Sequence, residues 1–456
     1  MTHRAAVIGA GPSGFYAAAS LLKERFEVDL YDVLPTPYGL VRFGVAPDHP
    51  KIKSVTRAFD KTAAQPGFRF FGGVEVGTDV TRAELLERYH AVVYTTGSSA
   101  DNRLGIAGED LPGSHPATEF VAWYNGHPHH TDREFDLSCE RAVVVGNGNV
   151  AIDVARMLVL DPEELAPTDT ADHALDAFMT AQVKEVVLLG RRGPAQAAFT
   201  NPELLELGEL QRSDVIVDPA DLELDAASEA WLAGEDSDIT SRPNVEILRE
   251  YAGREPEGKS HRIVLKFLRS PLEILGGDRV EGMRIGINRI EENGGRLSAV
   301  STGEEETLEC GLVLRSIGYR GVPIPDVPFD ERAGLIRNDG GRVLGDDDKP
   351  VPGEYVSGWI KRGPSGVIGT NKKDANDTVA RMLEDVASNS LNEPGLDVDG
   401  DEVAAWIRSK VPTSVTWEDW QRIDAHETSL GEPNGRPRVK LVRVEDMHDV
   451  VARARG

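Results

Sequence analysis

The chain has 456 residues, with 76 acidic and 50 basic side chains and a formal net charge of −26. This charge excludes non-specific binding to nucleic acid and attraction to an anionic membrane surface, and no apolar run approaches the ~20 residues that a membrane helix needs. Its two cysteines, Cys139 and Cys310, form no C-x-x-C motif, which excludes a thioredoxin-reductase-like redox disulfide and a cluster held by cysteines alone. Such sparse cysteines are typical of a reducing compartment, so we expect a cytoplasmic location and no signal peptide.

Residues 6–14 are expected to form a short apolar strand, a glycine turn and the start of a helix. Gly9 allows the tight turn, Gly11 lets a pyrophosphate approach the backbone, and Gly14 lets the helix pack closely against the strand. The next expected strand ends in Asp32, where a carboxylate can accept hydrogen bonds from ribose hydroxyls. The pattern predicts a dinucleotide-binding domain; the alternative is a glycine turn without a ligand.

The segment that follows is rich in proline and glycine over residues 33–56. Such a loop is too long to be a simple connector, so we expect it to have a function. A helix is expected over residues 57–64, and short strands are expected over 68–71 and 74–76. A buried strand over residues 91–97 ends in a glycine turn and returns the chain to the edge of the first domain.

A second strand, glycine turn and helix start lie at residues 142–151, with the glycines Gly146 and Gly148. Two such fingerprints in one chain are far more specific than one. The strand after the second fingerprint ends in Arg191 and Arg192, where an NAD site would have an acid. Guanidinium groups match a phosphate, so the pair predicts a 2′-phosphate and hence NADP. The alternative is a solvated basic turn.

The remaining segments are assigned from their apolar patterns. Residues 214–300 are the least distinctive and contain an acidic helical stretch over 221–238, followed by β-like runs such as residues 262–268. The other expected elements are a polar helical insert over 162–182, a strand-to-glycine return over 312–320, a core strand over 354–359, a glycine-rich turn over 363–370 and helices over 374–386, around 404–407 and over 417–426.

These elements predict an α/β protein with two Rossmann-like dinucleotide-binding domains, as in flavoproteins of the glutathione-reductase type. The first domain is expected to be discontinuous. It comprises residues 1–101 and residues 319–456, and the second part includes a C-terminal extension. Residues 102–318 form the second domain.

Three side chains outside the fingerprints are candidates for catalysis. His49 lies in a loop that Pro47 and Pro50 stiffen, and a stiff loop can hold a side chain beside a flavin. Asp153 and Glu206 are acids near the second fingerprint and beyond the arginine pair. For each of the three, the alternative is an ordinary surface or helix-face residue.

Two further features concern ligands. His127, His129 and His130 lie in a polar loop without a fixed ligand spacing or a completing pair of acids, so we expect no metal site. The turn over residues 363–370 leads into a helix. Such a helix end can face the pyrimidine side of a flavin and stabilise negative charge there, and the alternative is a packing turn.

The chain resembles the adrenodoxin-reductase-like NADPH–ferredoxin reductases, particularly their actinobacterial members. The resemblance covers nearly the whole chain, and its motifs are long. They lie at residues 34–42, 44–50, 146–151, 190–194, 358–364 and 366–373.

The resemblance implies FAD in the first domain and NADP in the second. It assigns to FAD the residues Ser13, Asp32, Leu40, Val76, Trp359, Gly366, Val367 and Ile368. In the expected FAD site these residues join Gly9, Gly11, Pro12, Gly14, Gly39 and Gly97. It assigns to NADP the residues Asn147, Gly148, Asn149, Val150, Arg191, Arg192 and Glu203, which join Gly146, with Gly366 near the nicotinamide.

The resemblance also implies roles for several single residues. His49 is implied to lie beside the flavin and to modulate hydride transfer, with Asp153 and Glu206 as nearby acids. The family tends to have an arginine where this chain has Asn102, so Asn102 and the following Arg103, which can substitute for that arginine, are both candidates for this NADP contact.

The implied activity is that of a ferredoxin–NADP(+) reductase. NADPH gives up electrons as a hydride, and FAD can pass them on singly to a separate ferredoxin. Because ferredoxins are commonly acidic, docking on this acidic chain requires local basic side chains. The candidates are Lys51, Lys53, Arg57, Lys61, Arg212, Lys361, Arg362, Lys372 and Lys373. The alternatives are an NADPH-oxidising subunit like that of glutamate synthase, a monooxygenase and a FAD-binding sensor without turnover.

Overall fold

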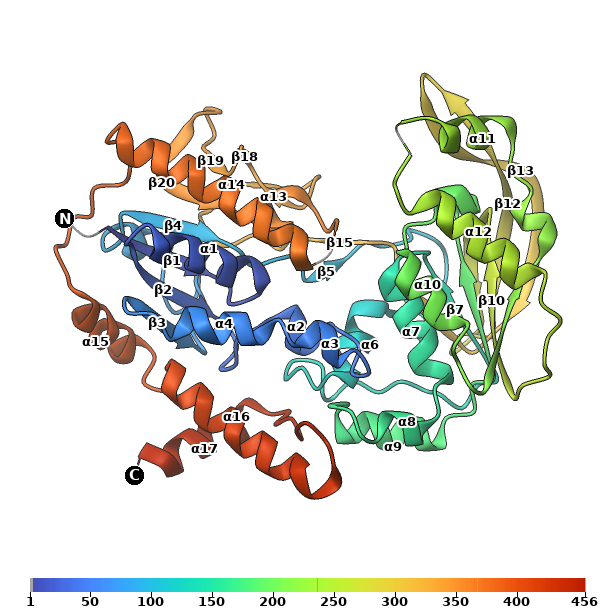
Figure 1. Cartoon of the computed structure of the whole chain (residues 1–456), viewed down its shortest axis with the longest axis horizontal. Helices are drawn as coiled ribbons and strands as arrows, with labels where there is room; N and C mark the ends of the chain where they lie inside the picture. The colour runs from blue at the N-terminus through green and yellow to red at the C-terminus, as the bar shows by residue number, and fades with distance from the viewer. Residues whose placement is uncertain (1–2, 236, 367, 456) are drawn as a thin grey trace. The chain divides into compact units, whose positions relative to one another are not determined.

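A computed structural model describes residues 3–235, 237–366 and 368–455. The chain divides into two compact units. Unit 1 consists of Met1–Ala100, Asn125–Pro128 and Gly318–Gly456, and unit 2 consists of Asp101–Tyr124 and His129–Ile317. In Figure 1, unit 1 therefore takes up both the blue and the orange-to-red ends of the colour range.

A seven-stranded sheet forms the centre of unit 1, in the order β18-β19-β20-β4-β1-β2-β3. Its strands are β1 (Arg4–Ile8), β2 (Glu27–Asp32), β3 (Phe68–Gly72), β4 (Ala91–Tyr94), β18 (Asn338–Asp339), β19 (Arg342–Leu344) and β20 (Pro350–Val356). The five strands from β20 to β3 are parallel, and β18 and β19 extend one edge in antiparallel pairs. A strand from the C-terminal part of the chain thus lies beside strands from the N-terminal part.

Helices cover both faces of this sheet. The helices of unit 1 are α1 (Pro12–Lys23), α2 (Leu40–Phe43), α3 (Pro50–Lys53), α4 (Thr56–Ala63), α5 (Arg82–Leu86), α13 (Trp359–Arg362), α14 (Ile368–Ala387), α15 (Gly400–Lys410), α16 (Trp417–Gly431) and α17 (Val444–Arg455). Ala5 and Val7 of β1 belong to an apolar cluster with α1, α4, α14, α16 and α17. Ala6 and Ile8 belong to a second cluster with α5 and α15. This alternation is the period of two of a strand that is buried on both faces.

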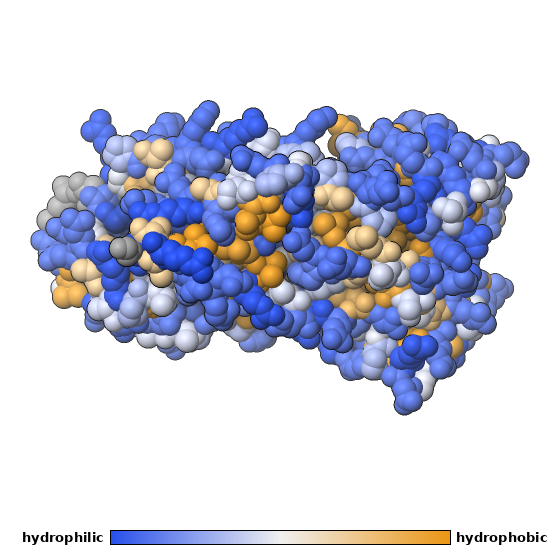
Figure 2. Space-filling model, turned by 90° about the horizontal axis from the view of Figure 1, so that it is seen from below, coloured by the Kyte–Doolittle hydropathy of each residue, from blue (hydrophilic) through white to orange (hydrophobic). Residues whose placement is uncertain are grey.

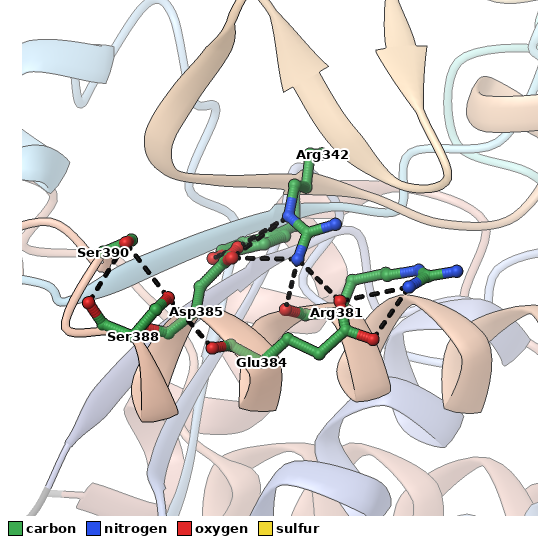
Figure 3. A network of polar contacts seen from close by, with 7 residues as sticks. Arg342, Arg381, Glu384, Asp385, Ser388 and Ser390 are labelled. Atoms are coloured by element: carbon green, nitrogen blue, oxygen red, sulfur yellow. Dashed lines mark hydrogen bonds and ion pairs between the residues drawn. The ribbon is translucent and has the colours of Figure 1, made fainter.

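Polar contacts fix α14 against the sheet. Figure 3 shows Arg342 of β19 reaching Glu384 and Asp385 near the end of α14, with hydrogen bonds of 2.9 Å to each carboxylate. Tyr355 of β20 donates its hydroxyl to Asp385 at 2.7 Å. Helix α14 also packs along α1, as Figure 1 shows. The N-terminal ends of α1 and α14 both follow glycine turns.

Several expected elements in unit 1 have different bounds. The proline-rich loop over residues 33–56 contains α2 and α3, and the helix expected over 374–386 begins already at Ile368. The strand expected over 354–359 ends at Val356, so Trp359 begins α13. Residues 74–76 form no strand, because Val76 makes only an isolated bridge to Val80.

A six-stranded, fully parallel sheet forms the centre of unit 2, in the order β6-β14-β7-β8-β10-β9. Its strands are β6 (Ser114–Pro116), β7 (Arg141–Val145), β8 (Glu185–Leu189), β9 (Ser213–Val217), β10 (His261–Lys266) and β14 (Leu312–Arg315). The helices of this unit are α6 (Ala117–Tyr124), α7 (Asn149–Val159), α8 (Pro162–Leu165), α9 (Asp172–Thr180), α10 (Asn201–Leu207), α11 (Ala226–Ala233) and α12 (Ser241–Ala252).

Unit 2 also has an antiparallel sheet that the sequence did not predict. It is formed by β11 (Arg269–Leu275), β12 (Gly282–Asn293) and β13 (Arg296–Glu309) in that order. The expected acidic helix over 221–238 is shorter and is represented by α11. The predicted α/β class with two Rossmann-like parallel sheets and a discontinuous first part is confirmed.

The two cysteines are free, and they pack on opposite faces of the parallel sheet of unit 2. Within the described residues, no helix combines the length and the apolar character that a membrane crossing requires. Hydrophilic side chains predominate on the face drawn in Figure 2, as expected for a chain with a net charge of −26.

Candidate dinucleotide-binding sites

The first glycine turn joins β1 to α1 in unit 1. Gly9 has φ +107°, and a Cβ there would lie 2.8 Å from the carbonyl oxygen of Thr95. A Cβ at Gly14 would lie 2.0 Å from the carbonyl oxygen of Gly9, so this helix packs on its own turn. A Cβ at Gly11 would meet nothing within 4 Å. Gly11 therefore has open space on one side and lies next to the first N–H groups of α1. Open space beside the N-terminus of a helix is typical of an anion-binding site.

The loop after β2 packs directly on this turn. Gly39 has φ +48°, and a Cβ there would lie 3.0 Å from the Cα of Gly11. Tyr38 donates its N–H to the carbonyl oxygen of Ala10 at 2.8 Å. Leu40 follows as the first residue of α2 and is 44% exposed. The proline-rich segment thus forms a wall beside the glycine turn.

Asp32, at the end of β2, braces the same turn. Its carboxylate accepts the N–H of Ala10 at 2.7 Å and the N–H of Leu34 at 2.9 Å. Burial raises its pKa to about 6, while these two hydrogen bonds act to lower it. Each carboxylate oxygen keeps a further lone pair, so contact with a ribose hydroxyl stays a prediction.

The residues around Trp359 form the next side of the site. Ser13 of α1 donates to Ser357 at 3.0 Å, and Gly358, with φ +83°, donates its N–H to Asp374 at 2.5 Å. The ring of Trp359 stacks on Tyr319 with a centroid distance of 6.1 Å. Its Nε1–H is buried and has no hydrogen-bond partner among residues 3–235, 237–366 and 368–455.

Gly366 precedes α14 in a backbone conformation with φ +78°. A Cβ there would lie 2.5 Å from the hydroxyl of Thr370. Ile368 begins α14 and packs against the core, whereas Val367 lies outside the described residues. Gly97, which follows β4, has φ +75° and open space around it.

The second glycine turn joins β7 to α7 in unit 2. Gly146 has φ +143°, and a Cβ there would lie 2.1 Å from the carbonyl oxygen of Ser316. A Cβ at Gly148 would meet nothing within 4 Å. Asn149 begins α7, with Val150 next, and accepts the N–H of Thr200 at 2.8 Å. The Nδ2 of Asn147 is buried without a hydrogen-bond partner in the described part of the chain.

Arg191 and Arg192 follow β8 and are both exposed. Neither makes an ion pair with a carboxylate of the described residues, although this chain has an excess of acids. Partial burial and the charges of Arg191 and Arg296 lower the pKa of the Arg192 guanidinium. The turn thus presents uncompensated positive charge, which suits a phosphate.

Comparison with known proteins identifies the family. Residues 3–188 match the family described as pyridine nucleotide-disulphide oxidoreductase. The NADPH-ferredoxin reductase FprA of Mycobacterium tuberculosis is 51% identical to this chain, over 97% of each. The mitochondrial NADPH:adrenodoxin oxidoreductase of Salvelinus fontinalis is 42% identical over 97% of this chain and 90% of its own. The structure of M. tuberculosis FprA in complex with NADPH matches with a TM-score of 0.94 and 50% identity, covering 99% of this chain and 100% of that one.

The chain belongs to the NADPH–ferredoxin reductase family. This confirms the family that the sequence motifs indicated, and it makes the chain an oxidoreductase that uses FAD and NADP(H).

The residues present fit both cofactors of an NADPH–ferredoxin reductase. In unit 1, the buried polar atoms Trp359 Nε1 and Thr36 Oγ1 lack partners among the described residues, and the turn at Gly11 is open. In unit 2, the same holds for Asn147 Nδ2 and for the turn at Gly148. Buried polar groups in proteins are nearly always paired, so these atoms are consistent with hydrogen bonds to a bound ligand.

The structure brings two of the predicted catalytic residues together. Arg156 of α7 is 6% exposed in its side chain and lies 3.2 Å from Asp153 and 3.6 Å from Glu206. Glu203 lies one turn before Glu206 on α10. Sequence reasoning missed Arg156, because its partners come from two different helices. His49 immediately precedes α3 in unit 1, and its backbone carbonyl oxygen accepts the N–H of Ile52 at 3.1 Å.

Arg103 and Asn102 lie near the start of unit 2. Arg103 donates to both carboxylate oxygens of Asp110, at 2.6 and 2.7 Å, and lies 3.7 Å from Glu109. A role of Arg103 in binding NADP therefore requires competition with these acids. The contact of this NADPH–ferredoxin reductase with NADP at Asn102 or Arg103 stays a prediction.

A buried ion pair between α2 and α16 was not predicted. Arg42 of α2 and Glu427 of α16 are joined by two hydrogen bonds, and their side chains are 4% and 0% exposed. Glu427 also accepts the N–H of Leu441 at 2.8 Å and lies 3.3 Å from Arg438. Burial alone would raise the pKa of Glu427, but the charges of Arg42 and Arg438 and the hydrogen bonds hold it below its ordinary value.

Lys440 completes this cluster. Its Nζ is buried and donates to the carbonyl oxygens of Arg42, at 3.1 Å, and of Asn125, at 3.0 Å. The C-terminal extension thus holds the short helix that carries Leu40. No spacing in the sequence could have revealed these contacts, because the partners are hundreds of residues apart.

Proposed function

We propose that this chain passes electrons from NADPH to a separate ferredoxin-type iron–sulfur protein. The observation that carries the proposal is the uncompensated arginine pair after the second glycine turn, in a chain that is similar over its full length to NADPH–ferredoxin reductases. Bound FAD supplies the conversion between a donor of electron pairs and an acceptor of single electrons. The protein binds and aligns the two cofactors and leaves room for the acceptor.

In unit 1, the first turn of α1 and Gly11 would hold the pyrophosphate of FAD, and Asp32 would accept its ribose hydroxyls. The other residues proposed to hold FAD line the loop after β2, the turn after β4 and the α13–α14 region. They are Gly9, Pro12, Ser13, Gly14, Gly39, Leu40, His49, Val76, Gly97, Trp359, Gly366, Val367 and Ile368.

In unit 2, the turn from Gly146 to Val150 would hold the pyrophosphate of NADPH, and Arg191 and Arg192 would hold its 2′-phosphate. Glu203, Asn102 and Arg103 are proposed as further NADP contacts. Asp153 and Glu206 share Arg156, so we assign to them a role in fixing the local geometry beside the reacting cofactors. His49 is proposed to modulate hydride transfer.

Docking of ferredoxin requires exposed basic side chains on an acidic protein. Lys51 on α3 and Arg57 and Lys61 on α4 are exposed and make no ion pair with a described acid. Ile52, between them in sequence, is 39% exposed and adds an apolar contact. Lys361 and Arg212 are less suitable, because they pair internally with Asp374 and Asp161. We therefore assign the docking of the partner to α3 and α4. We also infer a cytoplasmic location, since both cysteines are free.

Stopped-flow reduction of the holoenzyme under anaerobic conditions tests this function. NADPH should bleach the flavin bands much faster than NADH, and a ferredoxin should then reoxidise the protein at a rate that falls with added salt. Arg191→Gln and Arg192→Gln should each raise the KM for NADPH about 10- to 100-fold, the value of one charge-assisted hydrogen bond, and leave NADH nearly unchanged. Equal effects on both nucleotides would refute the assignment of the 2′-phosphate.

A further inference from the structure

The antiparallel sheet β11–β13 of unit 2 packs against the turn over residues 190–193, which contains Arg191 and Arg192 and is called the arginine turn below. Leu268, just before β11, donates its N–H to the carbonyl oxygen of Arg192 at 3.1 Å. Arg269 donates its N–H to the carbonyl oxygen of Gly190 at 2.9 Å. A parallel dinucleotide-binding sheet does not need such an antiparallel addition. Its contacts fall on the backbone of the turn that we assign to the 2′-phosphate.

Asn288 of β12 makes the most direct of these contacts. It is 7% exposed, and its Nδ2 donates to the carbonyl oxygen of Arg191 at 3.0 Å and to the hydroxyl of Ser270 at 2.7 Å. Its own N–H is bonded to the carbonyl oxygen of Leu268 at 2.8 Å. The buried side-chain N–H₂ group of Asn288 thus joins the carbonyl oxygen of Arg191 to Ser270, and this holds the peptide after Arg191 in one orientation.

Arg296 is placed by the same hairpin. It is the first residue of β13, opposite Asn293, after a turn in which Gly294 and Gly295 have φ +60° and +83°. On the same hairpin, the side chain of Ile290 lies 3.9 Å from where a Cβ of Gly193 would be. The hairpin therefore extends from the arginine turn toward Arg296.

The charge of Arg296 is uncompensated. It is exposed and makes no ion pair within the described ranges of the chain, whereas its hairpin neighbour Arg289 pairs with Glu291 at 2.6 Å. Its charge reaches Arg192, because Arg296 and Arg191 both disfavour the charged form of that guanidinium. Since no described acid forms an ion pair with any of these three cations, they repel one another, and a bound anion would relieve this repulsion.

We propose that the β12–β13 hairpin completes the 2′-phosphate site, with Asn288 as a positioning residue for the Arg191–Arg192 turn and Arg296 as a third cation that sets the preference for NADPH. This inference rests on the proposed use of NADPH. It adds to that proposal two residues that determine the preference for NADPH over NADH and that lie about a hundred residues further along the chain than Arg191 and Arg192.

Binding of adenosine 2′,5′-bisphosphate to the FAD-loaded enzyme, measured by titration calorimetry beside adenosine 5′-monophosphate, tests the inference without turnover. Arg296→Gln should weaken binding of the bisphosphate about fivefold, should leave the monophosphate unchanged and should make the salt dependence shallower. Arg289→Gln is the matched control on the same hairpin and should change neither.

Asn288→Ala should also weaken the bisphosphate selectively and raise the KM for NADPH more than it lowers kcat, and Asn288→Gln should restore part of the loss. Bisphosphate binding by Arg296→Gln at the wild-type affinity would overturn the role of Arg296. Equal losses for both nucleotides in Asn288→Ala would overturn the positioning role. If the wild-type enzyme itself bound both nucleotides equally, the proposed 2′-phosphate site would fail, which is a distinct result.

Discussion

Replacing Glu427 by glutamine tests the buried ion pair that holds α2. In the wild type, Glu427 offers two oxygens to Arg42, and both side chains are excluded from water. Glutamine keeps the shape and one acceptor but removes the negative charge. The guanidinium of Arg42 then stays buried beside Trp420, 5.3 Å from its ring centroid, without a counter-charge.

Removing one partner of a buried ion pair costs about 3–5 kcal/mol, because the other charge is left uncompensated. Since glutamine retains a hydrogen bond, we expect the low end of this range. The free energy needed to open α2 should therefore fall by about 3 kcal/mol. At about 1.4 kcal/mol for each factor of ten, amide exchange within α2 should accelerate by about 100-fold. FAD should dissociate more readily, because α2 carries Leu40 and follows Gly39.

Hydrogen–deuterium exchange measures this directly at the amide of Phe43, which donates to Gly39 in the wild type at 2.9 Å. Glu418→Gln is the matched control on the same helix, since Glu418 is 75% exposed and its pair with Arg422 is worth at most about 0.5 kcal/mol. The apolar double replacement Arg42→Met with Glu427→Leu should be less harmful than Glu427→Gln alone. A loss under about 1 kcal/mol in Glu427→Gln would refute the reasoning.

Two further predictions concern the glycine turn between β1 and α1. Gly14→Ala should yield protein without flavin and with a lowered melting temperature, since the new methyl group would lie 2.0 Å from the carbonyl oxygen of Gly9. Gly11→Ala should melt at the temperature of the wild-type apoprotein and lose only FAD affinity, as measured by quenching of flavin fluorescence. The reverse pattern would contradict the packing argument. For Asp32, burial raises the folded-state pKa to about 6, so ionisation of this carboxyl destabilises the apoprotein. This cost is absent below about pH 4 and complete above about pH 6. As the pH rises from about 4 to about 6, the free energy of unfolding of the wild-type apoprotein should therefore fall by of order 2 kcal/mol relative to Asp32→Asn. Parallel curves of stability against pH for the two proteins, from melting experiments at pH 4 to 8, would exclude this effect of Asp32.

The parts of the sites that the sequence predicts are those that local backbone rules determine. Gly9, Gly14 and Gly146 are needed where a side chain would strike a carbonyl oxygen, and this requirement leaves a short pattern in the sequence. The arginine pair is equally local, because it directly follows a strand. Such features are readable without knowledge of the tertiary structure.

Other features depend on contacts between distant segments. In the sequence, Glu427 has the pattern of an ordinary acid on a helix, and only the structure shows its contact with Arg42. Asn288 likewise has the pattern of a polar residue in a strand, and only the structure shows its contact with Arg191. The β12–β13 hairpin was missed because much of β13 is exposed and its apolar side chains do not alternate regularly. Helices α2 and α3 have four residues each, which is too short for a helical period to be recognised.

The order of assembly follows from the way in which unit 1 is divided along the chain. Its sheet needs β20 beside β4, and α2 needs Glu427, Arg438 and Lys440, all of which leave the ribosome late in synthesis. Unit 2, by contrast, is nearly contiguous and can fold while the chain is still growing. The unit whose translation begins first is therefore completed last, after the whole of unit 2 has been synthesised.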